Sequence, residues 1–149
     1  MPQKEFVMRG KIPSGTDEVL NFSGKNKGYA YRMTEFQIYP STNIGGANHE
    51  LAATVTAAKT HEDPSSPNFN NEGLIASAYT TGPNDAYSGN QQTIVDDTFL
   101  ITQDLIIAVI DTVAGSPMDV NYQCRFESVK MTGPEEAATN YKQFTISDA

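Results

Sequence analysis

DVNYQCRFESVKMTGPEEAA, residues 119–138, changes its pattern halfway along. Its first half alternates one apolar residue with one polar residue. The apolar positions are Val120, Tyr122, Cys124 and Phe126, and the polar positions are Asn121, Gln123, Arg125 and Glu127. Because successive side chains of a β-strand point to opposite faces, this alternation predicts a strand with one face in the core and the other in water.

The second half of the stretch predicts a short carboxy-terminal helix. Pro134 suits the first position of a helix, where its missing N–H is not needed. Glu135 and Glu136 follow in the first turn, where the positive end of the helix dipole favours carboxylates. We expect the helix to reach about Lys142 and to pack onto the edge or end of a sheet.

Seven further segments have the composition and alternation of strands. They are residues 5–12, 18–22, 29–39, 50–59, 73–81, 93–102 and 105–112. The alanines of the fourth segment also permit a helix, but Leu51, Ala53, Val55 and Ala57 recur at the period of two that a strand requires. A strand is therefore our prediction there.

Segment 105–112 is apolar enough to be a central strand, buried on both faces or nearly so. Only Gln103 and Asp104 separate it from 93–102, a gap short enough for a tight hairpin. We expect an irregularity within 93–102 at Asp96-Asp97. The core face of 105–112 is one of two alternatives: Leu105, Ile107 and Val109, or Ile106, Ala108 and Ile110.

The third predicted strand carries a row of aromatic residues. At a period of two, Tyr29, Tyr31 and Tyr39 share one face, and Phe36 and Ile38 share the other. Such a row can stack sugars, but the chain has no Trp, the side chain that sugar platforms use most readily. We therefore expect the row to lie in the core or at a subunit interface.

Eight strands joined by long polar connections predict an all-β fold. At 149 residues the chain has the length of one domain, which we place at 1–149. Its charged fraction of 19% is low for a helical bundle. We predict a single antiparallel β-sandwich, an eight-stranded jelly roll with the short helix at its carboxy-terminal end.

The net charge of −8, from 10 Lys and Arg against 18 Asp and Glu, argues against nucleic acid as a partner. Binding to phosphates requires a basic patch, and the basic residues are scattered along the sequence. The same balance opposes adsorption to an anionic membrane, and the longest apolar run, 105–110, is too short to cross one. The first residues lack the apolar core of a signal peptide, so we expect synthesis in a host cytoplasm.

No arrangement of residues predicts catalysis, a cofactor or a metal site. The serines lack the Gly-x-Ser-x-Gly elbow of hydrolases, and there is no glycine-rich phosphate loop. His61, Glu62 and Asp63 are adjacent, but they match neither the spacing of a zinc site nor the alternating carboxylates of a calcium loop. Cys124, the single cysteine, is expected to be a small buried hydrophobe.

Three connections are long and rich in Pro, Asn, Ser and Gly: residues 41–49, 60–72 and 82–92. Long irregular loops in a compact domain are often functional. The candidate interface or ligand residues lie in these loops and next to them. They are His61, Asp63, Phe69, Tyr79 and Tyr87.

The strand count, the long loops and the ending NYQCRFESVKMTGPEEAA carry a family resemblance. An amphipathic strand followed by a polar turn and an acidic helix resembles the ending of small jelly-roll virion proteins of marine bacteriophages. The resemblance implies a structural role, several symmetric copies and no catalysis. Shell proteins that touch the genome usually carry a basic amino-terminal arm, and here it would consist only of Lys4, Arg9 and Lys11. The resemblance therefore implies a subunit that faces outward.

We expect a non-enzymatic structural protein of a virion: a decoration, cement or knob protein, or a small capsid subunit. It would form a symmetric oligomer, such as a trimer, and bind a major capsid protein or another virion protein, mostly through its long loops. The alternative is a carbohydrate- or receptor-binding β-sandwich module that uses Tyr79, Tyr87 and the loops 60–72 and 82–92.

Overall fold

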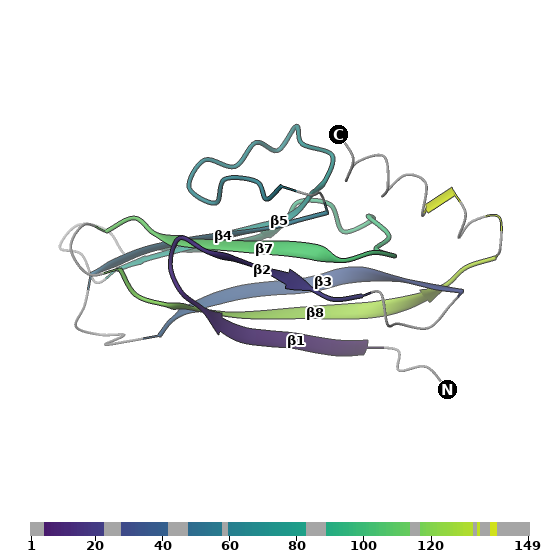
Figure 1. The fold of residues 1–149 in the computed structure, drawn as a ribbon, viewed down its shortest axis with the longest axis horizontal. Helices are drawn as coiled ribbons and strands as arrows, with labels where there is room; N and C mark the ends of the chain where they lie inside the picture. The colour runs from purple at the N-terminus through teal and green to yellow at the C-terminus, as the bar shows by residue number, and fades with distance from the viewer. Residues whose placement is uncertain are drawn as a thin grey trace.

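The computed structural model of the chain is all-β, with two antiparallel sheets that face each other (Figure 1). It describes residues 5–22, 28–41, 48–57, 60–82, 89–113, 117–132, 134 and 138–139. One sheet has the order β1-β8-β3 and the other the order β2-β7-β4-β5-β6. The strands are β1 (Glu5–Ile12), β2 (Asp17–Leu20), β3 (Tyr29–Pro40), β4 (His49–Thr56), β5 (Leu74–Gly82), β6 (Gly89–Ile94), β7 (Leu105–Asp111) and β8 (Val120–Lys130).

The alternating stretch forms β8, the central strand of the three-stranded sheet. Its apolar residues are buried, and the polar residues between them are partly exposed. β8 pairs antiparallel with β1 on one side and with β3 on the other. The prediction of one core face and one solvent face is confirmed.

The core lies between the two sheets. β7 contributes three buried side chains to it, those of Leu105, Ile107 and Val109. The first of the two predicted alternatives for this strand is therefore correct. β7 lies between β2 and β4, and its opposite face is also covered in part, since Ala108 is buried and Ile106 and Ile110 are half-buried.

Four aromatic rings meet in the core: Phe6, Phe22, Tyr31 and Phe126. Neighbouring ring centroids lie 5.0 to 6.1 Å apart, in stacked, tilted and edge-on arrangements. Such geometries add to the stabilisation that burial of the rings provides. Phe22 is also fixed through its backbone, because its N–H donates to Asp104 Oδ1 at 2.6 Å.

The strand pairs are nested in sequence order, so that each inner pair lies between the two members of the pair outside it. β1 pairs with β8, β2 with β7, and β4 with β5, all antiparallel. Beyond β6, Ile101 forms an isolated bridge to Tyr31 of β3, and their two backbone hydrogen bonds measure 2.9 and 2.7 Å. Three antiparallel strand pairs and one isolated bridge are therefore nested along the sequence and distributed over the two sheets.

The sixth strand differs from the predicted segment 93–102. β6 ends at Ile94, because the next residues form a turn around Asp96. Asp96 Oδ1 accepts hydrogen bonds from the N–H and the hydroxyl of Thr98, at 3.0 and 2.7 Å. An Asp side chain that bonds the backbone two residues further on favours a turn. The expected irregularity at this position thus ends the strand.

Two further expectations about this region are wrong. The predicted hairpin across residues 103–104 does not form, because β6 lies at the sheet edge and β4 and β5 separate it from β7. The predicted loop 82–92 is shorter than expected, because β6 begins at Gly89 and pairs with β5.

The predicted aromatic row on β3 is also wrong. The β3–β8 register shifts between Met33 and Glu35, which is a β-bulge. One extra residue reverses the side on which all later side chains point. Tyr31 consequently faces the core, whereas Tyr39 lies on the outer face and is 56% exposed.

The predicted carboxy-terminal helix lies largely outside the described residues. Pro134, Ala138 and Thr139 have helical backbone conformation. The helix from Pro134 to about Lys142 stays a prediction.

Candidate functional site

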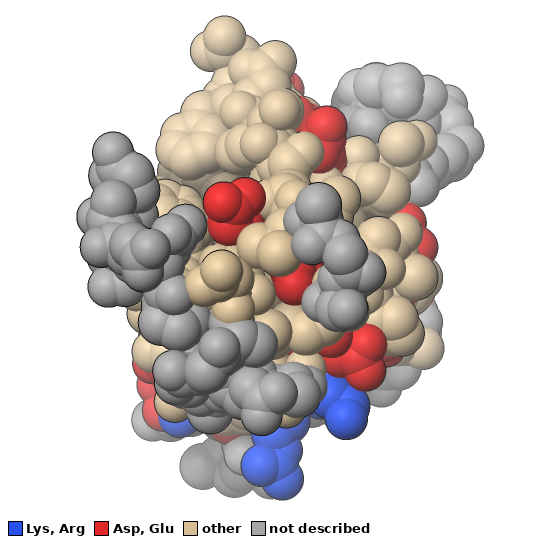
Figure 2. All heavy atoms as spheres, turned by 90° about the vertical axis from the view of Figure 1, so that its left-hand side faces the viewer, with Lys and Arg blue, Asp and Glu red and all other residues tan. Residues whose placement is uncertain are grey.

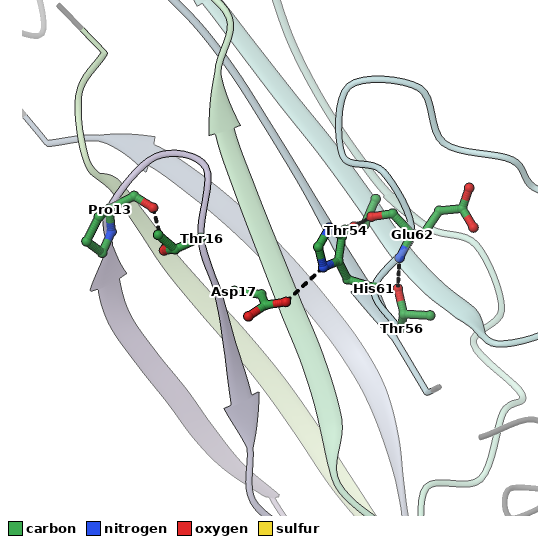
Figure 3. A network of polar contacts seen from close by, with 7 residues as sticks. All are labelled: Pro13, Thr16, Asp17, Thr54, Thr56, His61 and Glu62. Carbon is green, nitrogen blue, oxygen red and sulfur yellow. Dashed lines mark hydrogen bonds and ion pairs between the residues drawn. The ribbon is translucent and has the colours of Figure 1, made fainter. Parts of the chain in front are cut away.

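The connection between β4 and β5 is the long loop that rises above the five-stranded sheet (Figure 1). It is anchored on Thr54 and Thr56 of β4, which point away from the core and yet are fully buried. Thr54 Oγ1 donates to the carbonyl of Glu62 at 2.7 Å, and the N–H of Glu62 donates to Thr56 Oγ1 at 3.1 Å (Figure 3). The loop is therefore docked on the outer face of the sheet.

The carboxylate of Glu62 accepts hydrogen bonds from two other residues of this loop. One oxygen accepts from the N–H of Asn68 at 2.9 Å, and the other accepts from Asn71 Nδ2 at 2.6 Å. Asn71 in turn accepts from the N–H of Gly73 through its Oδ1 at 2.9 Å. Hydrogen bonds to a charged acceptor are stronger than neutral ones, so Glu62 gives the loop a defined shape.

His61 connects the loop to a second strand. Its Nδ1 lies 2.8 Å from Asp17 Oδ2 of β2 (Figure 3). In the sheet register Ala108 of β7 lies between Asp17 and Thr54. The pair of His61 and Asp17 therefore spans β7, which explains why Ala108 is buried on the outer face.

Asp63 shapes the first turn of the loop. Its Oδ1 accepts from the hydroxyl and the N–H of Ser65, at 2.8 and 2.9 Å. These hydrogen bonds hold the pKa of the Asp63 carboxyl below its ordinary value of 3.8, and nearby His61 adds to the effect. The side chain is exposed, and its bonds are used to fix the turn.

Phe69 and Tyr79 present aromatic surface to solvent, and the two residues are 56% and 47% exposed. Phe69 lies in the loop, and Tyr79 lies on the outer face of β5, opposite Ala52 of β4 and Gln91 of β6. Tyr87 lies outside the described residues. The structure thus places three of the predicted residues on one loop and Tyr79 on the sheet face from which that loop rises.

Four residues that organise this region were not predicted: Asp17, Thr54, Thr56 and Glu62. The two threonines alternate with Ala53 and Val55, which is a signal for the strand but not for a covered outer face. Asp17 is one acidic residue among several, and nothing in the sequence pairs it with His61. Glu62 stands beside His61 in the sequence, but its role depends on Asn68 and Asn71.

Within the described ranges, no group of three His, Cys, Asp or Glu side chains could hold a metal ion. Cys124 is free and fully buried, as predicted, and burial raises the pKa of its thiol. Among the residues that the structure describes, no helix has the length and apolar character needed to span a bilayer.

In the described residues, positive charge is confined to the three-stranded sheet, whereas carboxylates occur on both sheets. Among the residues that the structure describes, every Lys and Arg lies on β1, β3 or β8: Arg9, Lys11, Arg32, Arg125 and Lys130. The five-stranded sheet and the connections between its strands carry carboxylates there: Asp17, Glu18, Glu50, Glu62, Asp63, Glu72, Asp96, Asp97, Asp104 and Asp111. In the end view the blue side chains lie along the lower margin, on the side of the three-stranded sheet (Figure 2).

No protein-family model matches the chain, and no curated protein matches it. The surfaces described above are therefore the basis for the functional proposal.

Proposed function

We propose that the protein is a non-enzymatic structural subunit of a virus particle, which forms a symmetric oligomer and sits outward as a decoration, cement or knob protein. The observation that carries this proposal is the nesting of the strand pairs. In a jelly roll, strand 1 pairs with 8, 2 with 7, 3 with 6 and 4 with 5, across two sheets. Viral coat domains are a common use of that fold.

The topology supports a jelly roll with one modification. Three of the four nested pairs are complete ladders. The fourth is reduced to the bridge between Tyr31 and Ile101, because β6 pairs with β5 instead of β3. The turn at Asp96 accounts for this change, since it ends the strand before the chain reaches β3.

Exposed apolar side chains on both outer faces are compatible with burial against neighbours. Val7 and Tyr39 lie on the three-stranded sheet, and Val19, Phe69 and Tyr79 lie on the five-stranded sheet and its loop. A subunit that contacts copies of itself and a capsid protein would cover such residues on more than one side.

Native mass spectrometry of the isolated protein, followed by sedimentation with shells that lack it, tests this proposal. We expect an oligomer, and we expect it to bind the shells. A protein that stays monomeric at high concentration and does not bind the shells would contradict the proposal.

A carbohydrate- or receptor-binding module is the second candidate, and the exposed ring of Tyr79 favours it. The ring lies on an open sheet face next to Gln91, and such an arrangement can stack a sugar and bond its hydroxyls. A glycan array tests this candidate. Binding that Tyr79→Ala removes and Tyr39→Ala retains would support it, because Tyr39 is also exposed, on the other sheet.

A further inference from the structure

The outer face of the three-stranded sheet has two adjacent cross-strand rows without a carboxylate. The rows are Arg9–Gln123–Gln37 and Lys11–Asn121–Tyr39, and we call these six residues the basic patch. Elsewhere on this face Arg32 pairs with Glu127, and Arg125 lies 3.9 Å from Glu35.

The cations of the basic patch are available for a partner. Within the described part of the chain, neither Arg9 nor Lys11 forms an ion pair, in contrast to Arg32. Exposed Arg and Tyr side chains are enriched at protein interfaces, and this patch contains both types.

Gln123 adds an unpaired hydrogen-bond acceptor to the basic patch. Its Oε1 is buried and has no hydrogen-bond partner among the described residues. Leaving a buried acceptor unpaired is costly, and a rotation of the Gln123 amide that turns Oε1 outward toward a docked donor would remove that cost. The acceptor lies in the same row as Arg9, between β1 and β3.

The opposite side of the sandwich carries the complementary charge. Exposed carboxylates are spread along the outer face of the five-stranded sheet and its loop, with Glu50 and Glu72 at opposite ends of the β4–β5 pair. We call the four residues Asp17, Glu50, Asp63 and Glu72 the acidic patch. In the described residues no Lys or Arg lies on that sheet or in the connections between its strands. Glu50 and Asp17 are held in place by Thr112 and His61, at 2.7 and 2.8 Å.

We propose that the basic patch of one copy binds the acidic patch of a second copy. This inference rests on the proposed function, because it names the partner through which the subunit assembles. The two patches lie on opposite outer faces, so the contact is head-to-tail and generates a ring or an open stack.

A second copy fits the basic patch better than nucleic acid does. Glu5, Glu35 and Glu127 lie on the same outer face, where a continuous phosphate backbone would meet them, whereas the separate carboxylates of a second copy can contact Arg9 and Lys11 without facing these glutamates. The net charge of −8 opposes nucleic acid and also repels a second copy at long range, so the proposed contact depends on local matching of carboxylates with Arg9 and Lys11.

The test is a charge exchange between the two patches, measured by sedimentation velocity. Arg9→Glu with Lys11→Glu alters the basic patch, and Glu50→Lys with Glu72→Lys alters the acidic patch. Each variant alone should associate at least about tenfold more weakly than wild type, because like charges then face each other. An equimolar mixture should recover association, because each altered patch then meets a complementary one.

Controls separate a specific contact from a general effect of charge. Arg9→Glu and Lys130→Glu change the net charge equally, but Lys130 lies outside the basic patch, so only Arg9→Glu should weaken association. Far-ultraviolet circular dichroism checks that the variants fold. Raising the salt concentration should weaken association of the wild-type protein itself, which keeps the inference testable if a variant misfolds.

The outcomes distinguish this inference from the proposed function. A wild-type oligomer that is indifferent to salt and to the exchanges would overturn the head-to-tail contact and leave the structural role standing. A wild-type monomer at low salt that also fails to bind shells would count against both. Binding of single-stranded DNA that Arg9→Glu with Lys11→Glu abolishes would replace the second copy with nucleic acid.

Discussion

Gly10 of β1 lies directly opposite Tyr122 of β8, and the Tyr122 ring occupies the space that a side chain at position 10 would need. A Cβ at Gly10 would lie 3.0 Å from Cε1 and 3.1 Å from Oη of Tyr122. Tyr122 is buried, and this burial raises the pKa of its phenol. The glycine therefore allows a large aromatic side chain to lie flat against an edge strand.

Gly10→Ala should destabilise the protein, because the ring of Tyr122 has to move from a packed position. We expect a loss of about 1–3 kcal/mol in the free energy of unfolding, measured by urea titration. The effect should largely disappear in a Tyr122→Val background, which removes the ring. Equal losses in both backgrounds would show that the contact with Tyr122 is not the cause.

Phe126→Ala should cost about 3–5 kcal/mol of unfolding free energy, because a fully buried aromatic ring is replaced by a cavity. The Phe126 ring centroid lies 5.0 Å from that of Phe22 and 5.4 Å from that of Phe6. Tyr39→Ala is the matched control, since its exposed ring should contribute less than about 0.5 kcal/mol. A loss below about 1 kcal/mol for Phe126→Ala would mean that this face is not the core.

Glu62→Gln should loosen the loop between β4 and β5 without unfolding the sheets. A neutral amide offers one oxygen, so the N–H of Asn68 and the amide of Asn71 can no longer each bond a charged oxygen. Hydrogen exchange of the Asn68 amide should become faster, while exchange in β8 should not change. Glu72→Gln is the control, because no hydrogen bond of Glu72 holds this loop among those described. Unchanged protection of Asn68 would contradict the role given to Glu62.

Ser65→Ala should raise the pKa of Asp63 toward its ordinary value of 3.8, because the hydroxyl hydrogen bond is the largest cause of the lowered pKa. A carboxyl with a lowered pKa in the folded protein stabilises it above the unfolded pKa. That contribution is lost as the pH falls through the folded pKa. Carbon-detected NMR titration of Asp63 measures the change. Ser66→Ala should have little effect, because only the backbone of Ser66 contributes.

The strands were predictable because alternation is a local property. β8 and β1 follow directly from their residues, and the core face of β7 was one of two alternatives until the structure placed Leu105 in the core. The two wrong predictions, the aromatic row on β3 and the hairpin before β7, each depend on a few residues. The bulge at Met33 and Glu35 moved Tyr39 to the other face, and the turn at Asp96 removed the expected hairpin.

The organisation of the loop was not predictable, because it depends on partners that are distant in the sequence. Asp17 meets His61 only because β7 inserts between β2 and β4. The gathering of the described Lys and Arg residues on one sheet has the same origin. Arg9 and Arg125 are far apart in the sequence, and only the β1–β8 pairing places them on one face.

Asp111 is the last residue of β7, and its buried carboxylate organises one end of the sandwich. Oδ1 accepts from the N–H groups of Glu50 and Val113, both at 3.1 Å, and Oδ2 accepts from that of Met118 at 3.0 Å. Asp111→Ala leaves these donors without their acceptor, at a cost of about 1–3 kcal/mol for each that stays buried. Asp111→Asn keeps one acceptor oxygen and should cost less. Asp97→Ala, at an exposed position, should change the unfolding free energy by less than about 0.5 kcal/mol in the same urea titration. A loss for Asp111→Ala as small as that of Asp97→Ala would show that water replaces the carboxylate and that these bonds do not hold the end of the sandwich together.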